Sequence, residues 1–316
     1  MLSPTDAIQT DNSNIPTLQS MGVGEILDTT FSLYRKHFLL FLGIIAVYFF
    51  GSLVTYSLEG FLQDSDLKNL VPHLVNTPFV LVSMGGVIIA TATIYLDRHI
   101  TSPDALKQAL RRFWHLLGGY LLWTTTILVI PLIVTLLFLS SFMMRGTFSF
   151  PVLFIIPFVL LPFSIYFAVR WGFVAEVLLL EKTNVRNAFK RSSELVRGTW
   201  WRVFGLLVLI LLLSVAILYI FEISLGTIFI LAKAAGGTDF KELIQWSVMA
   251  EDLGSSNLIF YAIMTCTDLL LKTLIFPIWV IGIVLLYFDL RIRKEGFDIE
   301  IQADSRTARE PEPTVP

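Results

Sequence analysis

Residues 197–216, RGTWWRVFGLLVLILLLSVA, carry a basic residue, then two tryptophans, then a glycine that opens a long apolar segment. The same order occurs three times, with equal spacing between the aromatic residue and the glycine. The marker residues are Arg35, Phe38 and Gly43, then Arg111, Phe113 and Gly118, then Arg197, Trp200 and Gly205. Each first apolar segment is followed by a second that ends in an acid and a base, namely Asp97 and Arg98, Glu181 and Lys182, and Asp289 and Arg291. The pattern predicts three copies of one helical hairpin in a membrane.

The composition argues against an ordinary soluble domain. Of the 316 residues, 55% are hydrophobic and only 15% are charged, and the mean hydropathy is positive. One soluble core does not hide that much apolar surface. A hydrocarbon layer of about 30 Å needs about 20 apolar helical residues. Six segments are long enough, at about 38–58, 78–96, 117–140, 151–172, 203–232 and 257–288. We therefore expect an all-α membrane protein with six transmembrane helices.

The distribution of basic residues predicts the orientation, because basic loops resist translocation. Most of the 23 Lys and Arg residues lie beside the segment ends that share a side with both termini. The opposite side holds only Lys68, Arg145, Lys233 and Lys241, and Arg170 and Lys272 fall inside apolar segments. We expect a multi-pass membrane protein with both termini in the cytoplasm.

The predicted organisation is one six-span membrane domain, residues 21–300, between two short polar ends. Residues 1–20 lack the basic start and apolar centre of a secretory signal, and residues 301–316 combine prolines with mixed charge. Both ends are expected to be disordered and cytoplasmic. The three repeats are expected at about 22–98, 103–182 and 187–294.

Each repeat is predicted to begin with a cytoplasmic amphipathic helix. In the second copy Ser102 suits the cap, Pro103 the first helical position and Asp104 the positive end of the helix dipole. Apolar residues then recur at three- and four-residue spacing, at Ala105, Leu106, Ala109, Leu110 and Phe113. Such helices serve either as interfacial anchors or as a belt that senses lipid or docks a partner. The neighbouring tryptophans favour the anchor interpretation.

Three longer phrases carry a family resemblance: MGVGEILDTTFSLYRKHFLLFLG at 21–43, AFKRSSELVRGTWWRVFG at 188–205 and LLYFDLRIRKEGFDIE at 285–300. Together they resemble the bacterial multispan family described as the membrane domain of glycerophosphoryl diester phosphodiesterase, over residues 22–300. The resemblance implies a six-helix inner-membrane module, which in some proteins is joined to a soluble phosphodiesterase domain. This sequence has no hydrophilic region long enough for that domain, so phosphodiesterase activity is not expected.

Signatures of chemistry are missing from the sequence. It contains no HExxH, GxSxG, Walker loop, GxGxxG or CxxC pattern. His99 and His115 share a predicted loop without a third ligand at metal spacing, and Cys266 has no second cysteine to pair with. The basic loops are explained by their position beside the spans. We therefore expect no enzyme activity, cofactor, metal or nucleic-acid partner.

Five ionisable residues fall in or near the apolar segments, at Arg170, Glu176, Glu222, Asp268 and Lys272. A charge in the hydrocarbon costs several kcal/mol unless it is paired or faces water, so all five are expected to point inward. Asp268 and Lys272 are four residues apart and can pair on one helical face. Arg170 is expected to pair with Glu222 or Glu176.

Two functions fit these charges. In the favoured one the pairs only fix helix register, and the protein is a non-catalytic assembly, scaffold or lipid-associated component. In the alternative, the protein is a transporter or lipid-handling protein with a polar pathway between the fourth, fifth and sixth spans. The candidate ligand-binding residues are then the anion contacts Arg170 and Lys272 and the proton or cation acceptors Glu222 and Asp268. The expected partners are the lipid bilayer and either another membrane protein or a second copy of the chain.

Overall fold

The structure is a computed structural model that describes residues 20–61, 70–133, 135–136, 140, 150–234 and 258–296. Within these residues the chain is almost wholly helical and forms no strand. The two ends that were predicted to be disordered lie outside the described residues, apart from Ser20.

The long helices match the predicted spans in number and approximate position. They are α2 (Phe38–Phe61), α3 (Leu70–Tyr95), α5 (Phe113–Thr124) with the π-helical segment η1 (Thr125–Val129), α7 (Phe150–Arg170), α10 (Trp200–Ala234) and α12 (Leu258–Glu295). Within the described residues six stretches are long and apolar enough to cross a membrane: Phe38–Leu58, Val71–Tyr95, Phe113–Ile133, Leu160–Leu180, Trp200–Ser224 and Thr265–Glu295. The prediction of an all-α chain with six helices long and apolar enough to cross a membrane is confirmed for the described residues.

A short helix precedes the first span of each predicted repeat. These helices are α1 (Val23–Lys36), α4 (Ser102–Arg111) and α9 (Val185–Val196). Each has a buried apolar face, with Ile26, Ala109 and Ala188 fully buried, while Val23 and Leu110 remain exposed. In α4 the cap position belongs to Thr101 and not to Ser102, since the helix already begins at Ser102. The Ser102 hydroxyl donates instead to the Leu40 carbonyl of α2 at 2.9 Å.

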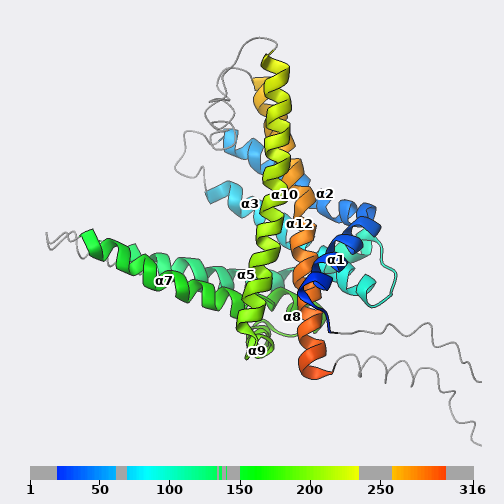
Figure 1. The fold of residues 1–316 in the computed structure, drawn as a ribbon, viewed down its shortest axis with the longest axis vertical. Helices are drawn as coiled ribbons and strands as arrows, with labels where there is room; N and C mark the ends of the chain where they lie inside the picture. Colours follow the sequence, from blue (N-terminus) through cyan, green and yellow to red (C-terminus); the bar gives the residue numbers. More distant parts are fainter. Residues whose placement is uncertain are drawn as a thin grey trace, which may run out of the picture.

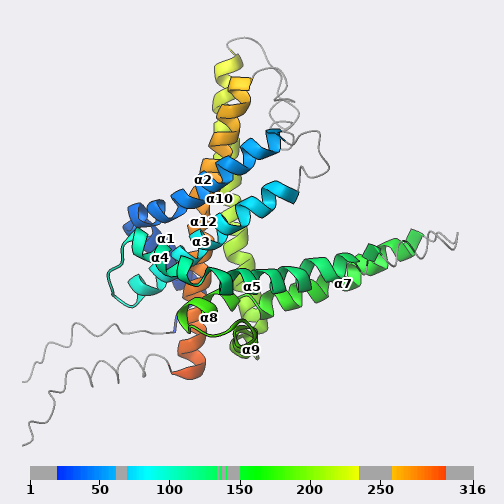
Figure 2. The same ribbon diagram turned by 180° about the vertical axis from the view of Figure 1, so that it is seen from behind.

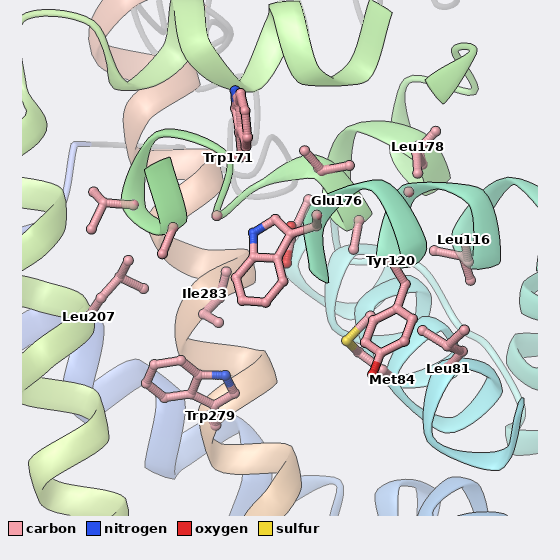
Figure 3. Close-up of a pocket in the computed structure, with 17 residues that line it drawn as sticks. Leu81, Met84, Leu116, Tyr120, Trp171, Glu176, Leu178, Leu207, Trp279 and Ile283 are labelled. Carbon is pink, nitrogen blue, oxygen red and sulfur yellow. The ribbon is translucent and has the colours of Figure 1, made fainter. Parts of the chain in front are cut away.

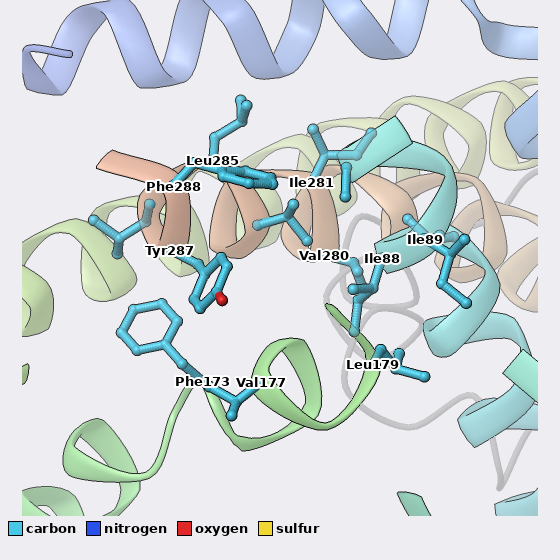
Figure 4. Close-up of a cluster of buried hydrophobic side chains, with 14 of the residues drawn as sticks. Ile88, Ile89, Phe173, Val177, Leu179, Val280, Ile281, Leu285, Tyr287 and Phe288 are labelled. Atoms are coloured by element: carbon cyan, nitrogen blue, oxygen red, sulfur yellow. The ribbon is translucent and has the colours of Figure 1, made fainter. Parts of the chain in front are cut away.

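The helix pairs diverge from a common base, which consists of α1, α4, α8 (Val174–Leu180), α9 and the last turns of α12. In Figures 1 and 2, α5 and α7 point away from α10 and α12, while α2 and α3 run in a third direction. The core lies where these elements meet. In Figure 4, Phe173, just before α8, faces Tyr287 of α12, while Ile88 of α3 lies near Val280 of α12.

Two polar networks hold the base together. In the first, the fully buried Asp289 accepts hydrogen bonds from the Met21 N–H at 2.8 Å, from Arg202 at 2.9 Å and from Arg293 at 2.9 Å. This carboxylate joins the start of α1 to α10 and α12. Hydrogen bonds from charged groups are among the stronger ones, so the network stabilises this junction.

The second network is centred on Glu181, which follows α8. Its carboxylate accepts a hydrogen bond from the Tyr287 hydroxyl at 2.8 Å and pairs with Arg191 of α9 at 3.0 Å. Arg191 also pairs with Glu295 at 2.7 Å. Burial alone would lower the pKa of Arg191, but its contacts with Glu295 and Glu181 outweigh burial and raise it. Glu181 and Asp289, the acids predicted to end the second and third repeats, thus hold elements of the base together.

Candidate functional site

Three of the four candidate residues lie together. Lys272 and Asp268 form the expected pair within α12, with Nζ and Oδ2 2.7 Å apart. Glu222 of α10 is close enough to both for electrostatic interaction, and Tyr56 of α2 interacts with Lys272. We call these four residues the far cluster, because they lie toward the ends of the helices that point away from the base.

The depth of the far cluster can be estimated along α10. The helix rises about 30 Å from Arg202 to Glu222, which equals the thickness of a hydrocarbon core. With Arg202 at one edge of the membrane, Glu222 reaches the opposite edge. The Lys272 and Asp268 side chains remain 44% and 32% exposed, in contrast to the inward orientation expected from the sequence. A half-exposed pair contributes little to stability beyond fixing helix register.

Arg170 lies apart from the far cluster. Its guanidinium donates to the Tyr166 hydroxyl at 2.9 Å and sits over the Tyr166 ring, not beside Glu222 or Glu176 as expected. The Tyr166 carbonyl in turn accepts a hydrogen bond from Trp200 at the start of α10. Arg170 therefore lies near the start of α10. Glu222 is about 33 Å further along that helix than Trp200.

A break after Arg170 separates α7 from α8 and turns the chain inward. The Ser192 hydroxyl of α9 donates to the Arg170 carbonyl at 3.0 Å and accepts from the Phe173 N–H at 3.2 Å. These two bonds satisfy backbone groups that a helix end would leave unpaired. The sequence predicted a fourth span that ends at about residue 172 and an inward-pointing Glu176 as a possible partner of Arg170, without a break between the two residues.

The break places Glu176 in a cavity of about 450 Å³ between α3, α5, α7, α8, α10 and α12. Figure 3 shows its carboxyl among Leu81, Met84, Leu207, Trp279 and Ile283. Other lining residues are Leu116, Tyr120, Trp123, Ala168, Trp171 and Leu178. The cavity is apolar, partly open and rich in aromatic rings, as small-molecule sites usually are.

Glu176 is only 3% exposed, and its Oε2 atom has no hydrogen-bond partner among the described residues. Burying a polar group without a partner costs free energy. The sequence signal for this residue was a single acid inside the apolar run Val174–Leu180. Sequence reasoning considered Glu176 only as a partner for Arg170, because it had no sign of the break before α8.

No metal site is evident, since the described part of the chain contains no group of three His, Cys, Asp or Glu residues able to hold an ion. His37 and His99 interact across the base, outside the spans. Burial, then the charge of Lys36 and then His99 lower the pKa of His37 below its ordinary value of 6.5.

The fold and the cavity define a multi-pass helical membrane protein with an internal apolar site. Residues 69–238, more than half of the chain, match the family described as Domain of unknown function (DUF8558), and the chain belongs to that family. No curated protein and no solved structure matches this chain. The family match runs from α3 into α10 and includes Glu176.

Proposed function

We propose that the protein is a non-catalytic, lipid-associated component of the bacterial inner membrane that holds an apolar chain in its cavity. The cavity of about 450 Å³ with almost wholly apolar walls is the observation that supports this function. Its volume falls in the range of about 300 to 1,000 Å³ that is typical of small-molecule sites.

The depth of the cavity favours a hydrocarbon ligand. Along α12, Ile283 and Trp279 are about 9 and 15 Å from Asp289, which lies at the base. With the base at the membrane edge, these two cavity residues lie at the level of acyl chains, below the headgroups. An apolar chain bound there would supply the van der Waals contacts that the walls of an empty cavity lack.

The membrane topology forms part of the proposal. Both termini are cytoplasmic and the base faces the cytoplasm, as the distribution of basic residues predicts. The chain consists of three hairpin repeats, each with a cytoplasmic amphipathic helix, a pattern that fits the resemblance to the phosphodiesterase-associated membrane domain. In support, a residue with a left-handed backbone conformation follows the second span of each proposed repeat, at Asp97, Lys182 and Gly296. Helices often end in this way.

The separation of Arg170 from the far cluster favours the lipid-associated function over a transport pathway. A pathway between the fourth, fifth and sixth spans was expected to use Arg170, Lys272 and Glu222 together. Instead, Arg170 lies near the start of α10, whereas Lys272 and Glu222 lie in the far cluster. The cavity between these two positions is lined mainly by apolar residues.

Native mass spectrometry after extraction in mild detergent tests the proposed function. We expect retained lipid on the wild-type protein and loss of that mass in Ala168→Phe, which fills the cavity from α7. Leu212→Phe is the matched control, because Leu212 is exposed on α10 and away from the cavity lining. Equal lipid retention by both variants would contradict the proposal, and a retained protein at fixed stoichiometry without lipid would indicate an assembly role instead.

A further inference from the structure

We propose that Glu176 selects an alkyl amine, whose chain fills the cavity and whose nitrogen donates a hydrogen bond to the Glu176 carboxyl. This inference rests on the proposed function, because it assigns the polar group of the ligand whose apolar part the cavity holds.

The unpartnered Oε2 atom of Glu176 is the first argument. It is buried, it points into the cavity, and no described residue donates to it. A ligand that carries a donor would satisfy this atom and remove the cost of its burial. An alkane or an ester carbonyl has no donor for it.

The chemistry of the walls distinguishes between possible donors. None of the described residues that line the cavity is Lys, Arg or His, so nothing there would compensate a carboxylate or phosphate ligand. A protonated amine would instead form a charge-assisted hydrogen bond with the carboxylate, which is stronger than the bond from a neutral hydroxyl.

The aromatic lining favours the same ligand. Tyr120, Trp123, Trp171 and Trp279 all contribute to the cavity wall. The faces of such rings attract organic cations. The Trp171 Nε1–H already donates to the Ser193 hydroxyl at 3.1 Å, so it is not free to bind an anion.

A series of ligands with the same chain and different polar ends tests the proposal. The thermal unfolding midpoint is measured in maltoside micelles during titration with octylamine, octanol or octanoate, since a ligand that binds the folded state raises this midpoint. The proteins are the wild type, Glu176→Gln, Ala168→Phe and the control Glu222→Gln, which removes an acid in the far cluster. Glu176→Gln keeps the shape of the side chain and is expected to fold.

We expect octylamine to bind the wild type and Glu222→Gln at least about tenfold more tightly than octanol does, and octanoate to bind most weakly. Glu176→Gln should lose the preference for octylamine and still bind octanol, while Ala168→Phe should bind neither. Equal binding of amine and alcohol by the wild type, with loss in Ala168→Phe, would overturn the amine proposal and leave the proposed function standing. No binding of any of the three ligands would overturn both.

The amine has two possible sources, a free alkyl amine or the amine of a bilayer lipid. Repeating the octylamine titration in nanodiscs of phosphatidylcholine, with and without phosphatidylethanolamine, distinguishes them. Weaker octylamine binding in the presence of phosphatidylethanolamine would identify the lipid amine as a competitor for Glu176, and equal binding would identify the free amine. Octylamine binding that does not depend on Glu176 in either nanodisc would overturn the proposal.

Discussion

The backbone N–H of Met21 donates a hydrogen bond to Oδ1 of Asp289 at 2.8 Å, across 268 positions of the chain. The Met21 carbonyl accepts hydrogen bonds from Arg202 and Arg293, which also contact the same carboxylate. Met21, which precedes the Gly22 cap of α1, is thereby fixed to the start of α10 and the end of α12. This junction closes the base beneath the diverging helix pairs.

Replacing Asp289 should weaken the base. Asp289→Asn removes a fully buried charge and leaves Arg202 and Arg293 without their acid. The loss of stability is expected to be about 2 kcal/mol, below the usual cost of breaking a buried pair because both arginines are about one third exposed. Unfolding in mixed micelles would measure it.

Asp268→Asn is the matched control, because it removes an acid from a half-exposed pair. Its expected cost is below about 1 kcal/mol. Equal losses from the two variants would show that Asp289 is no more important for stability than the half-exposed Asp268.

Removing the Tyr287 hydroxyl should have a smaller effect. Tyr287→Phe deletes the 2.8 Å hydrogen bond to Glu181 and leaves the Glu181 pair with Arg191 in place. One such bond contributes about 1 kcal/mol, so we expect a loss of that size in chemical unfolding. The added variant Arg191→Gln should lower stability further, and an unchanged unfolding midpoint in Tyr287→Phe alone would argue against this contact.

Gly51 permits close contact between α2 and α3. A methyl group at this position would lie 2.3 Å from Cγ of Phe79, so Gly51→Ala must displace that ring. We expect a loss of about 1 to 3 kcal/mol. In Gly205→Ala the new methyl meets nothing within 4 Å, and this control should be neutral or slightly stabilising because alanine favours the helix. Equal behaviour of the two variants would contradict the packing of α2 on α3.

The lowered pKa of His37 predicts a dependence of stability on pH. The unfolded chain binds this proton more readily than the folded protein, so the stability is fully present above the ordinary value of 6.5. It is lost as the pH falls through the lowered pKa. Between about pH 7.5 and about pH 5, the unfolding midpoint of His37→Gln should therefore fall less than that of the wild type. The same fall in both proteins would show that His37 does not contribute.

The sequence predicted the spans well because length and hydropathy decide whether a helix can cross a membrane. It also predicted the pair of Asp268 and Lys272, since spacing along one helix determines that contact. The partner of Arg170 was predicted wrongly, because Tyr166 satisfies it within α7. Tyr166 and Arg170 are four residues apart on one helix, so spacing allowed this contact. What the periodicity of a single helix does not contain is how the hairpins pack, and that packing decides whether Glu176 or Glu222 can reach Arg170.

The position of Glu176 in a cavity could not be predicted from the sequence either. Its cavity depends on the break between α7 and α8, and the break is stabilised by Ser192 of a later helix. No local pattern around Glu176 encodes that contact. The ion pairs of Asp289 with Arg202 and of Glu181 with Arg191 were likewise not predicted. In the sequence, both acids had marked only the ends of two predicted repeats.

Crosslinking with a photoactivatable acyl chain tests the central claim most directly. The protein is placed in membranes that contain a phospholipid with a diazirine in its chain, irradiated, digested and mapped by mass spectrometry. The account predicts labels on cavity residues such as Leu81 and Ile283, and their loss in Ala168→Phe while exposed Leu212 stays labelled. Labels on Leu212 and other exposed residues alone, with none in the cavity, would contradict it.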